Sequence, residues 1–291
     1  MNNNSDYIPI EIIDDSSDEE FELIPNKTNN PNKLDNPKKK STTSKLLKTK
    51  SDKLSLKTHQ TLLKKFYNED ENIFEIGIDE AGRGPLFGRV YTAAVILPKD
   101  DSFNHPLVKD SKKFHSKKKI EEVAEYIKEN ALAWYVSFED EKKIDEINIL
   151  QATQMAMHSS IHEIRKQFNK KQLELSKIER KDYSYNLLVD GNYFNPITIL
   201  NKNTNKMEIL PYITIEGGDN KYTAIAAASI LAKVERDKYI DDLCEKNPTL
   251  SEFYGIDSNK GYGAKRHMDG IKEHGITIWH RRSFGICKNY V

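Results

Sequence analysis

The chain has 291 residues, and its 45 basic and 45 acidic side chains give a formal net charge of zero. Its two cysteines, Cys244 and Cys287, have no paired spacing, which argues against a disulfide framework or a cysteine zinc site. No apolar run has the length of a membrane span, and the N-terminus lacks the basic start and apolar stretch of a secretory signal. We therefore expect an intracellular protein of the cytoplasm or nucleus.

Residues 1–57 are rich in Asn, Ser, Lys, Asp and Glu. We expect a disordered tail there, because such a segment cannot bury enough apolar surface to offset the entropy of ordering. Residues 1–25 carry eight acids, and residues 26–65 carry twelve Lys and two Asp. Subtraction from the totals leaves 33 basic and 35 acidic residues for 66–291, and Lys64 and Lys65 make this 35 and 35 for 58–291. The predicted domain, residues 58–291, is therefore not basic overall, and a nucleic-acid partner would need local basic patches.

Strand and helix signals alternate after the tail. Apolar runs of strand length and helical periodicity predict, in chain order, a short amphipathic helix over 54–67, strands over 73–78 and 90–97, a helix over 117–130, a strand over 131–138, a helix over 148–168 capped by Asn148, strands over 185–189 and 212–215, and a helix over 222–243. This order predicts an α/β fold with a mixed central sheet flanked by helices.

Acidic residues follow two of these strands and lie on the last helix. Asp79 and Glu80 end the first strand and run into a glycine-rich turn, and Asp190 follows the strand over 185–189. Asp237 shares a helix face with Ser229 and Lys233. Each acid alone is more often a cap or a surface charge, and a tight turn explains the first pair by itself. Together they predict carboxylates that converge on a hard cation, Mg²⁺ or Mn²⁺ rather than zinc.

The order of motifs resembles the ribonuclease H type 2 family. The matching stretches are Asp79–Leu86, Asp110–Lys113, Asn148–Thr153, Leu188–Gly191, Gly218–Asp219, Ile225–Lys233, Arg236–Asp237, Lys260–Gly263, His267 and His280–Phe284. They span the predicted domain, and so many ordered matches make coincidence implausible. Arg83 within Gly82-Arg83-Gly84 indicates type 2 rather than the related type 3 enzymes.

The resemblance implies a ribonuclease H-like fold and an endonuclease that cuts on the 5′ side of ribonucleotides. Its substrates would be RNA–DNA hybrids and single ribonucleotides embedded in duplex DNA, and its role ribonucleotide removal and RNA-primer clearance. The metal-binding and catalytic residues would be Asp79, Glu80, Asp190 and Asp237. Two Mg²⁺ or Mn²⁺ ions would serve hydrolysis to a 3′-hydroxyl and a 5′-phosphate. We expect a monomer.

The same resemblance implies how substrate is recognised. The backbone of Gly82, Arg83 and Gly84 would approach the 2′-hydroxyl, with Arg83 also placed against phosphate. Tyr262 would stack on the neighbouring sugar; without the family it would be taken as a core or turn aromatic. Further expected substrate contacts are Lys112, Lys113, Ser229 and Lys233, with a second basic cluster at Arg281 and Arg282.

Three short motifs lie in or next to the tail. A possible sliding-clamp-binding box consists of Gln60, Leu63, Phe66 and Tyr67, and the favoured alternative is that this segment packs on the catalytic domain. Pro37–Lys40 fits a nuclear-import signal or a Lys-rich linker equally well. Ile10–Ile13, followed by acids and Ser16 and Ser17, resembles a strand that binds a small protein modifier.

Two other functions compete with the nuclease. A junction resolvase would share the fold, but neither Gly-Arg-Gly nor Tyr262 is expected there. A non-catalytic hybrid-binding protein would carry vestigial acids, whereas all four are present.

Overall fold

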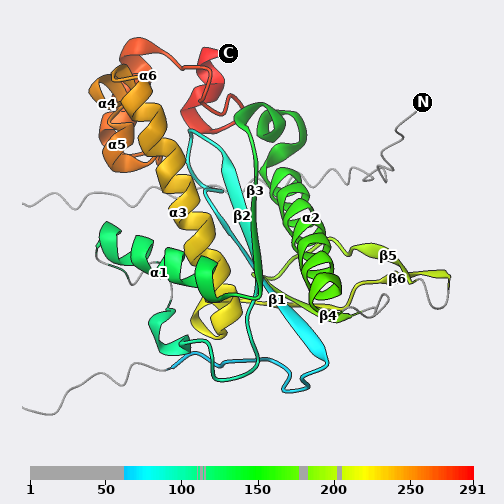
Figure 1. Ribbon diagram of the computed structural model, residues 1–291. Coiled ribbons are helices and arrows are strands. Elements are labelled where there is room, and N and C mark those ends of the chain that lie inside the picture. The colour runs from blue at the N-terminus through cyan, green and yellow to red at the C-terminus, as the bar shows by residue number, and fades with distance from the viewer. Residues whose placement is uncertain (1–61, 110, 112–113, 115, 177–182, 202–204) are drawn as a thin grey trace, which may run out of the picture. The chain divides into compact units, whose positions relative to one another are not determined.

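The computed structural model describes residues 62–291 apart from 110, 112, 113, 115, 177–182 and 202–204. A five-stranded sheet lies at the centre, in the order β3-β2-β1-β4-β7 (Figure 1). Its strands are β1 Ile73–Ala81, β2 Val90–Ile96, β3 Ala133–Glu139, β4 Ser184–Asp190 and β7 Tyr212–Ile215. Because β1 runs antiparallel to β2 and parallel to β4, the sheet is mixed.

Helices cover both faces of this sheet (Figure 1). On one face, alanines of α3 and residues of α1 pack against Ala93 and Val95 of β2. On the other, Ile161 of α2 belongs to the same buried cluster as Ile78 of β1. The bounds are α1 Lys117–Asn130, α2 Glu141–Ser176 and α3 Thr223–Lys246. The predicted α/β fold, with a mixed sheet flanked by helices, is confirmed.

The contact between α3 and β1 is unusually close. A Cβ on Gly77 would lie 2.2 Å from the carbonyl carbon of Ala224, so this position admits glycine alone. The first half of α3 is a run of buried small residues, including Ala226 and Ala228. Small side chains on both elements let α3 lie directly on β1, which brings the later turns of α3 to the end of that strand.

Asn148 caps the long part of α2, as predicted. Its φ is 64°, its ψ is 166°, and its side-chain oxygen accepts a hydrogen bond of 3.0 Å from the Gln151 backbone N–H. A preceding helical segment from Glu141 joins α2 at this kink and was not predicted. Other elements without a sequence prediction are the hairpin β5 Thr198–Asn201 and β6 Lys206–Ile209, and the short helices α4 Thr249–Tyr254, α5 Ile256–Asn259 and α6 Lys265–His274.

The predicted helix over 54–67 is wrong for its described part. Residues 62–67 are not helical, and Lys64 forms an isolated parallel bridge with Tyr222. The Lys64 N–H donates to the Lys221 carbonyl at 2.8 Å, and the Thr223 N–H donates to the Lys64 carbonyl at 3.0 Å. Backbone pairing with the start of α3 therefore replaces the helical hydrogen bonds that the apolar spacing suggested.

Of the possible clamp-binding box, Gln60 lies outside the described residues. Leu63 packs against the core on the α3 side, the Phe66 ring meets His105 edge-on, and the Tyr67 ring lies against Tyr222. This matches the packing alternative, and clamp binding stays a prediction. The tail over 1–57 and its motifs also lie outside the described residues, so the domain boundary stays a prediction. No helix in the described part of the chain is both long and apolar enough to cross a membrane.

Candidate active site

Two of the predicted carboxylates lie side by side at one edge of the sheet. Strands β1 and β4 are parallel, and Ile78 of β1 pairs with Val189 of β4. Asp79 and Asp190 are the next residues on their strands and therefore lie at the same level. This is the edge where the carboxyl ends of parallel strands meet, and ligand sites of open α/β sheets gather there.

Asp79 is the most buried of the four acids, with 4% of its surface exposed. Burial raises its pKa well above the usual value, and the neighbouring carboxylates of Glu80 and Asp190 raise it further. The Ser229 side chain of α3 hydrogen-bonds to it and opposes this shift in pKa. Asp190 also has a raised pKa, caused by burial, although its Oδ1 accepts a hydrogen bond of 2.6 Å from the Gly218 N–H. Burial therefore disfavours the charged forms of both carboxyls in the metal-free protein.

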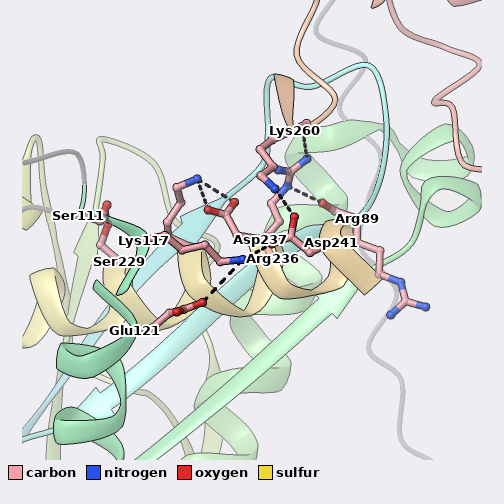
Figure 2. A network of polar contacts seen from close by, with 10 residues as sticks. Arg89, Ser111, Lys117, Glu121, Ser229, Arg236, Asp237, Asp241 and Lys260 are labelled. Atoms are coloured by element: carbon pink, nitrogen blue, oxygen red, sulfur yellow. Dashed lines mark hydrogen bonds and ion pairs between the residues drawn. The ribbon is translucent and has the colours of Figure 1, made fainter. Parts of the chain in front are cut away.

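Asp237 approaches from α3. The predicted shared face is confirmed, since the Lys233 ammonium lies 2.8 and 2.7 Å from the two oxygens of Asp237. One turn before Lys233, the Ser229 hydroxyl lies 3.0 Å from that of Ser111 (Figure 2). Lys112 and Lys113, the predicted phosphate contacts next to Ser111, lie outside the described residues.

The four acids are not arranged as a finished metal site. In the part of the chain that the structure describes, no group of three His, Cys, Asp or Glu side chains is placed to hold a metal ion. Two of the acids are instead paired with a basic side chain. Lys233 pairs with Asp237, and Arg83 Nη1 lies 3.4 Å from Glu80 Oε1. The donor set nevertheless fits a hard divalent cation, because it consists of carboxylate oxygens. Burial, and then the neighbouring acids Glu80 and Asp190, raise the pKa of Asp79, so a cation there would stabilise the charged form of that carboxyl.

Two buried arginines contact the Gly-Arg-Gly loop on its inner side: Arg281 donates hydrogen bonds to it, and Arg236 packs against Gly82. Arg281 is fully buried and donates from Nη2 to the Gly82 carbonyl at 2.6 Å, from Nη1 to the Arg83 carbonyl at 2.8 Å and from Nε to the Gly88 carbonyl at 2.8 Å. The prediction of Arg281 as part of a phosphate-binding cluster is therefore wrong. Its neighbour Arg282 is exposed.

Arg236 is the second of these arginines, with 2% of its surface exposed. Its guanidinium donates to the carbonyl of Phe87 at 3.2 Å and to that of Lys260 at 3.0 Å; Figure 2 shows Arg236 and Lys260. A Cβ on Gly82 would lie 2.1 Å from Arg236 Nε, and the φ of Gly82 is +92°, so both space and backbone conformation require glycine. These contacts join distant segments, so neither arginine's role could be found from local pattern.

Replacement of Arg281 should disturb this loop. We expect Arg281→Met to destabilise the protein by about 3–5 kcal/mol, because the buried carbonyls of Gly82, Arg83 and Gly88 lose charged donors. Arg281→Lys should recover part of the loss, since an ammonium keeps the charge but not the planar fork. Chemical denaturation measures both variants. An Arg281→Met protein as stable as the wild type would contradict the assignment.

Tyr262 lies at the surface beside the loop. Half of it is exposed (51%), and a Cβ on Gly84 would lie 3.7 Å from its ring, so it is not a core aromatic. Two buried histidines support its backbone. The Thr277 N–H donates to His280 Nδ1 at 2.9 Å, which leaves His280 Nε2 to donate to His267 Nε2 at 3.1 Å and His267 Nδ1 to donate to the Tyr262 carbonyl at 2.9 Å. The structure thus brings Tyr262 next to Gly84; its stacking role stays a prediction.

Comparisons of the sequence with known proteins identify one family. The family model described as Ribonuclease HII matches residues 76–287. Ribonuclease HII of Bacteroides thetaiotaomicron is 41% identical over 225 residues, which cover 77% of this chain and 95% of the relative. Ribonuclease HII of Neisseria meningitidis serogroup C is 37% identical over 218 residues, which cover 75% of this chain and 95% of that relative. The crystal structure of the ribonuclease H2 from Pyrococcus horikoshii OT3 aligns with a TM-score of 0.48 and 23% identity, covering 75% of this chain and 96% of that one.

Proposed function

The chain belongs to the ribonuclease HII family, and from this premise we propose that it cuts on the 5′ side of ribonucleotides, including single ribonucleotides embedded in duplex DNA. Membership makes it a ribonuclease H, a metal-dependent endoribonuclease that acts on RNA–DNA hybrids. The position of the cut, the embedded ribonucleotide and the two-ion mechanism are the proposal. So are action as a monomer and a role in ribonucleotide removal and RNA-primer clearance.

The observation that carries the proposal is the placement of Asp79 and Asp190 at one sheet edge, beside Glu80 and with Asp237 on the adjoining helix. These four carboxylates would hold the ions. Bound there, two Mg²⁺ or Mn²⁺ ions would supply Lewis acidity to the attacking water and to the leaving 3′ oxygen. Hydrolysis without a covalent intermediate then leaves a 3′-hydroxyl and a 5′-phosphate.

The orientation of the Gly-Arg-Gly loop supports the proposed detection of a 2′-hydroxyl. A trans peptide directs its N–H opposite to its C=O. Since Arg281 draws the carbonyls of Gly82 and Arg83 inward, the N–H groups of Arg83 and Gly84 point away from the buried arginine. They are available to a hydroxyl oxygen of the substrate, which DNA lacks. The exposure of the Tyr262 ring and its position beside Gly84 support the proposed contact with the adjacent sugar.

A duplex with one ribonucleotide tests the proposal. A labelled DNA duplex containing a single ribonucleotide, incubated with Mg²⁺ or Mn²⁺, should be cut immediately 5′ of that nucleotide, and an all-DNA duplex should stay intact. Cutting of a long RNA–DNA hybrid without cutting of the single-ribonucleotide duplex would overturn the assigned roles of Gly82–Gly84 and Tyr262. Failure on both substrates would overturn the proposed function.

A further inference from the structure

Two of the four acids proposed as metal ligands are covered by cations that are themselves expected to contact substrate. Lys233 lies on both oxygens of Asp237, at 2.8 and 2.7 Å, and Arg83 lies 3.4 Å from Glu80. By contrast, no Lys or Arg in the described ranges forms an ion pair with Asp79 or Asp190. Within the described residues the pairing is thus selective: Asp79 and Asp190 have hydrogen bonds but no basic partner, whereas Glu80 and Asp237 each pair with a basic side chain.

The geometry points to counter-ion exchange: we propose that Lys233 neutralises Asp237 in the metal-free protein, leaves it when a divalent cation binds, and then binds a phosphate of the substrate. This inference rests on the proposed function and assigns Lys233 a part in metal binding that no motif suggests. Arg83 on Glu80 repeats the same arrangement at the other outer acid.

The position of Lys233 allows such a movement. Its side chain is 40% exposed, and that of Asp237 is 23% exposed. Ion pairs between residues four apart on a helix are weak where both side chains are partly exposed, as here, so a divalent cation can displace the ammonium from the carboxylate. The next basic residue, Arg236, cannot move in this way, because it is almost fully buried and fixed to the Phe87 and Lys260 carbonyls.

Once it leaves Asp237, the Lys233 ammonium would lie near two other basic side chains. Lys117 and Lys260 lie close by and share the carboxylate of Asp241, one turn beyond Asp237; Lys117 is 2.6 Å from it (Figure 2). A nucleic-acid backbone that contacts Lys117 and Lys260 can therefore also bind the Lys233 ammonium, once that ammonium has left Asp237. Metal binding and substrate binding then strengthen each other, as linkage between two sites requires.

Titration of Mn²⁺ into the protein without nucleic acid is the first test. Lys233→Gln removes the competing ammonium and should tighten Mn²⁺ binding by about two- to fivefold, the range expected for an exposed ion pair. The matched control is Lys238→Gln: Lys238 is on the same helix, is 42% exposed and pairs with Glu125 and Glu235. It removes one positive charge without freeing an acid of the site, so Mn²⁺ binding should stay unchanged. Equal affinities for Lys233→Gln and Lys238→Gln would overturn the proposal.

The salt dependence of hybrid binding is the second test. Binding of an RNA–DNA duplex is measured in Ca²⁺ and in EDTA, with strand integrity checked on a denaturing gel. In the wild type, Ca²⁺ should steepen the slope of log K against log salt by about one unit, the value of one added phosphate contact. In Lys233→Gln this increment should disappear, and in Lys238→Gln it should remain.

These readouts separate the inference from the proposed function. A wild type that cuts no ribonucleotide-containing duplex, with Mn²⁺ binding tightened in Lys233→Gln alone, would overturn the function and support the counter-ion. A wild type that cuts such duplexes, with a Ca²⁺-dependent increment that Lys233→Gln retains, would overturn the exchange and leave the function standing.

Discussion

Asp190→Asn is expected to slow cleavage of a duplex with one ribonucleotide by about 10³-fold or more. A metal ion contributes several kcal/mol of charge stabilisation to the transition state, and each 1.36 kcal/mol is about tenfold in rate. The substitution removes a negative ligand from the centre of the proposed site while it changes one atom. Single-turnover cleavage in Mg²⁺ and in Mn²⁺ measures the loss.

Asp190→Asn should leave the fold intact, which makes the loss of rate interpretable. The amide oxygen of Asn can still accept the hydrogen bond from the Gly218 N–H. Burial raises the pKa of Asp190, so a neutral side chain suits the metal-free protein. The control is Glu216→Gln, an exposed acid that follows β7. A folded Asp190→Asn protein with less than tenfold loss of activity would exclude Asp190 as a metal ligand.

The part of the site that lies at strand ends could be predicted from the sequence. Asp79 and Asp190 follow apolar runs, and the rule that ligand sites gather at carboxyl ends of parallel strands needs no knowledge of the rest of the chain. Helix α1 occupies the predicted range, because its apolar residues recur with a clear helical period. The pairing of Lys233 with Asp237 likewise follows from a spacing of four residues.

Elements without a strong local pattern could not be predicted. Strands β5 and β6 have four residues each, which is too short a run for alternation of polar and apolar residues to distinguish a strand. Short helices such as α5 are too brief for periodicity; its neighbouring turns depend on left-handed conformations at Gly255 and Lys260. The segment after Leu62 carries an apolar spacing of helical type, but backbone pairing at Lys64 determines its structure.

The role of Arg281 depends on tertiary contacts and was misread for that reason. Two adjacent arginines near the end of a chain indicate an exposed basic cluster, and Arg282 is indeed exposed. Arg281 is buried because three carbonyls of a loop almost 200 residues earlier surround its guanidinium. Burial of an arginine without a carboxylate partner is rare, and nothing in the local sequence signals it.

Asp79→Asn is expected to have opposite effects on stability and on activity. Burial, followed by the charges of Glu80 and Asp190, raises the pKa of Asp79 well above its usual value of 3.8. A carboxyl whose pKa is raised by folding stabilises the protein below its unfolded pKa, and that stability is lost as pH rises through the folded pKa. At neutral pH the unfolded chain has an ionised Asp79 and the folded metal-free protein disfavours that charge, so folding costs free energy at this position. An amide avoids this cost.

Thermal unfolding across pH measures the stability difference between Asp79→Asn and wild type. In EDTA at neutral pH, we expect Asp79→Asn to unfold about 2–8 °C above the wild type, the shift that roughly 1–2 kcal/mol gives for a domain of this size. The difference should shrink as pH falls towards 3.8, where the wild-type carboxyl is protonated. Addition of Mn²⁺ should stabilise the wild type more than the variant, because a divalent cation compensates the buried charge. Cleavage should fall by about 10³-fold or more, as for any lost metal ligand. An Asp79→Asn protein that is less stable than the wild type in EDTA at neutral pH would contradict a stability cost from burial of the Asp79 carboxyl.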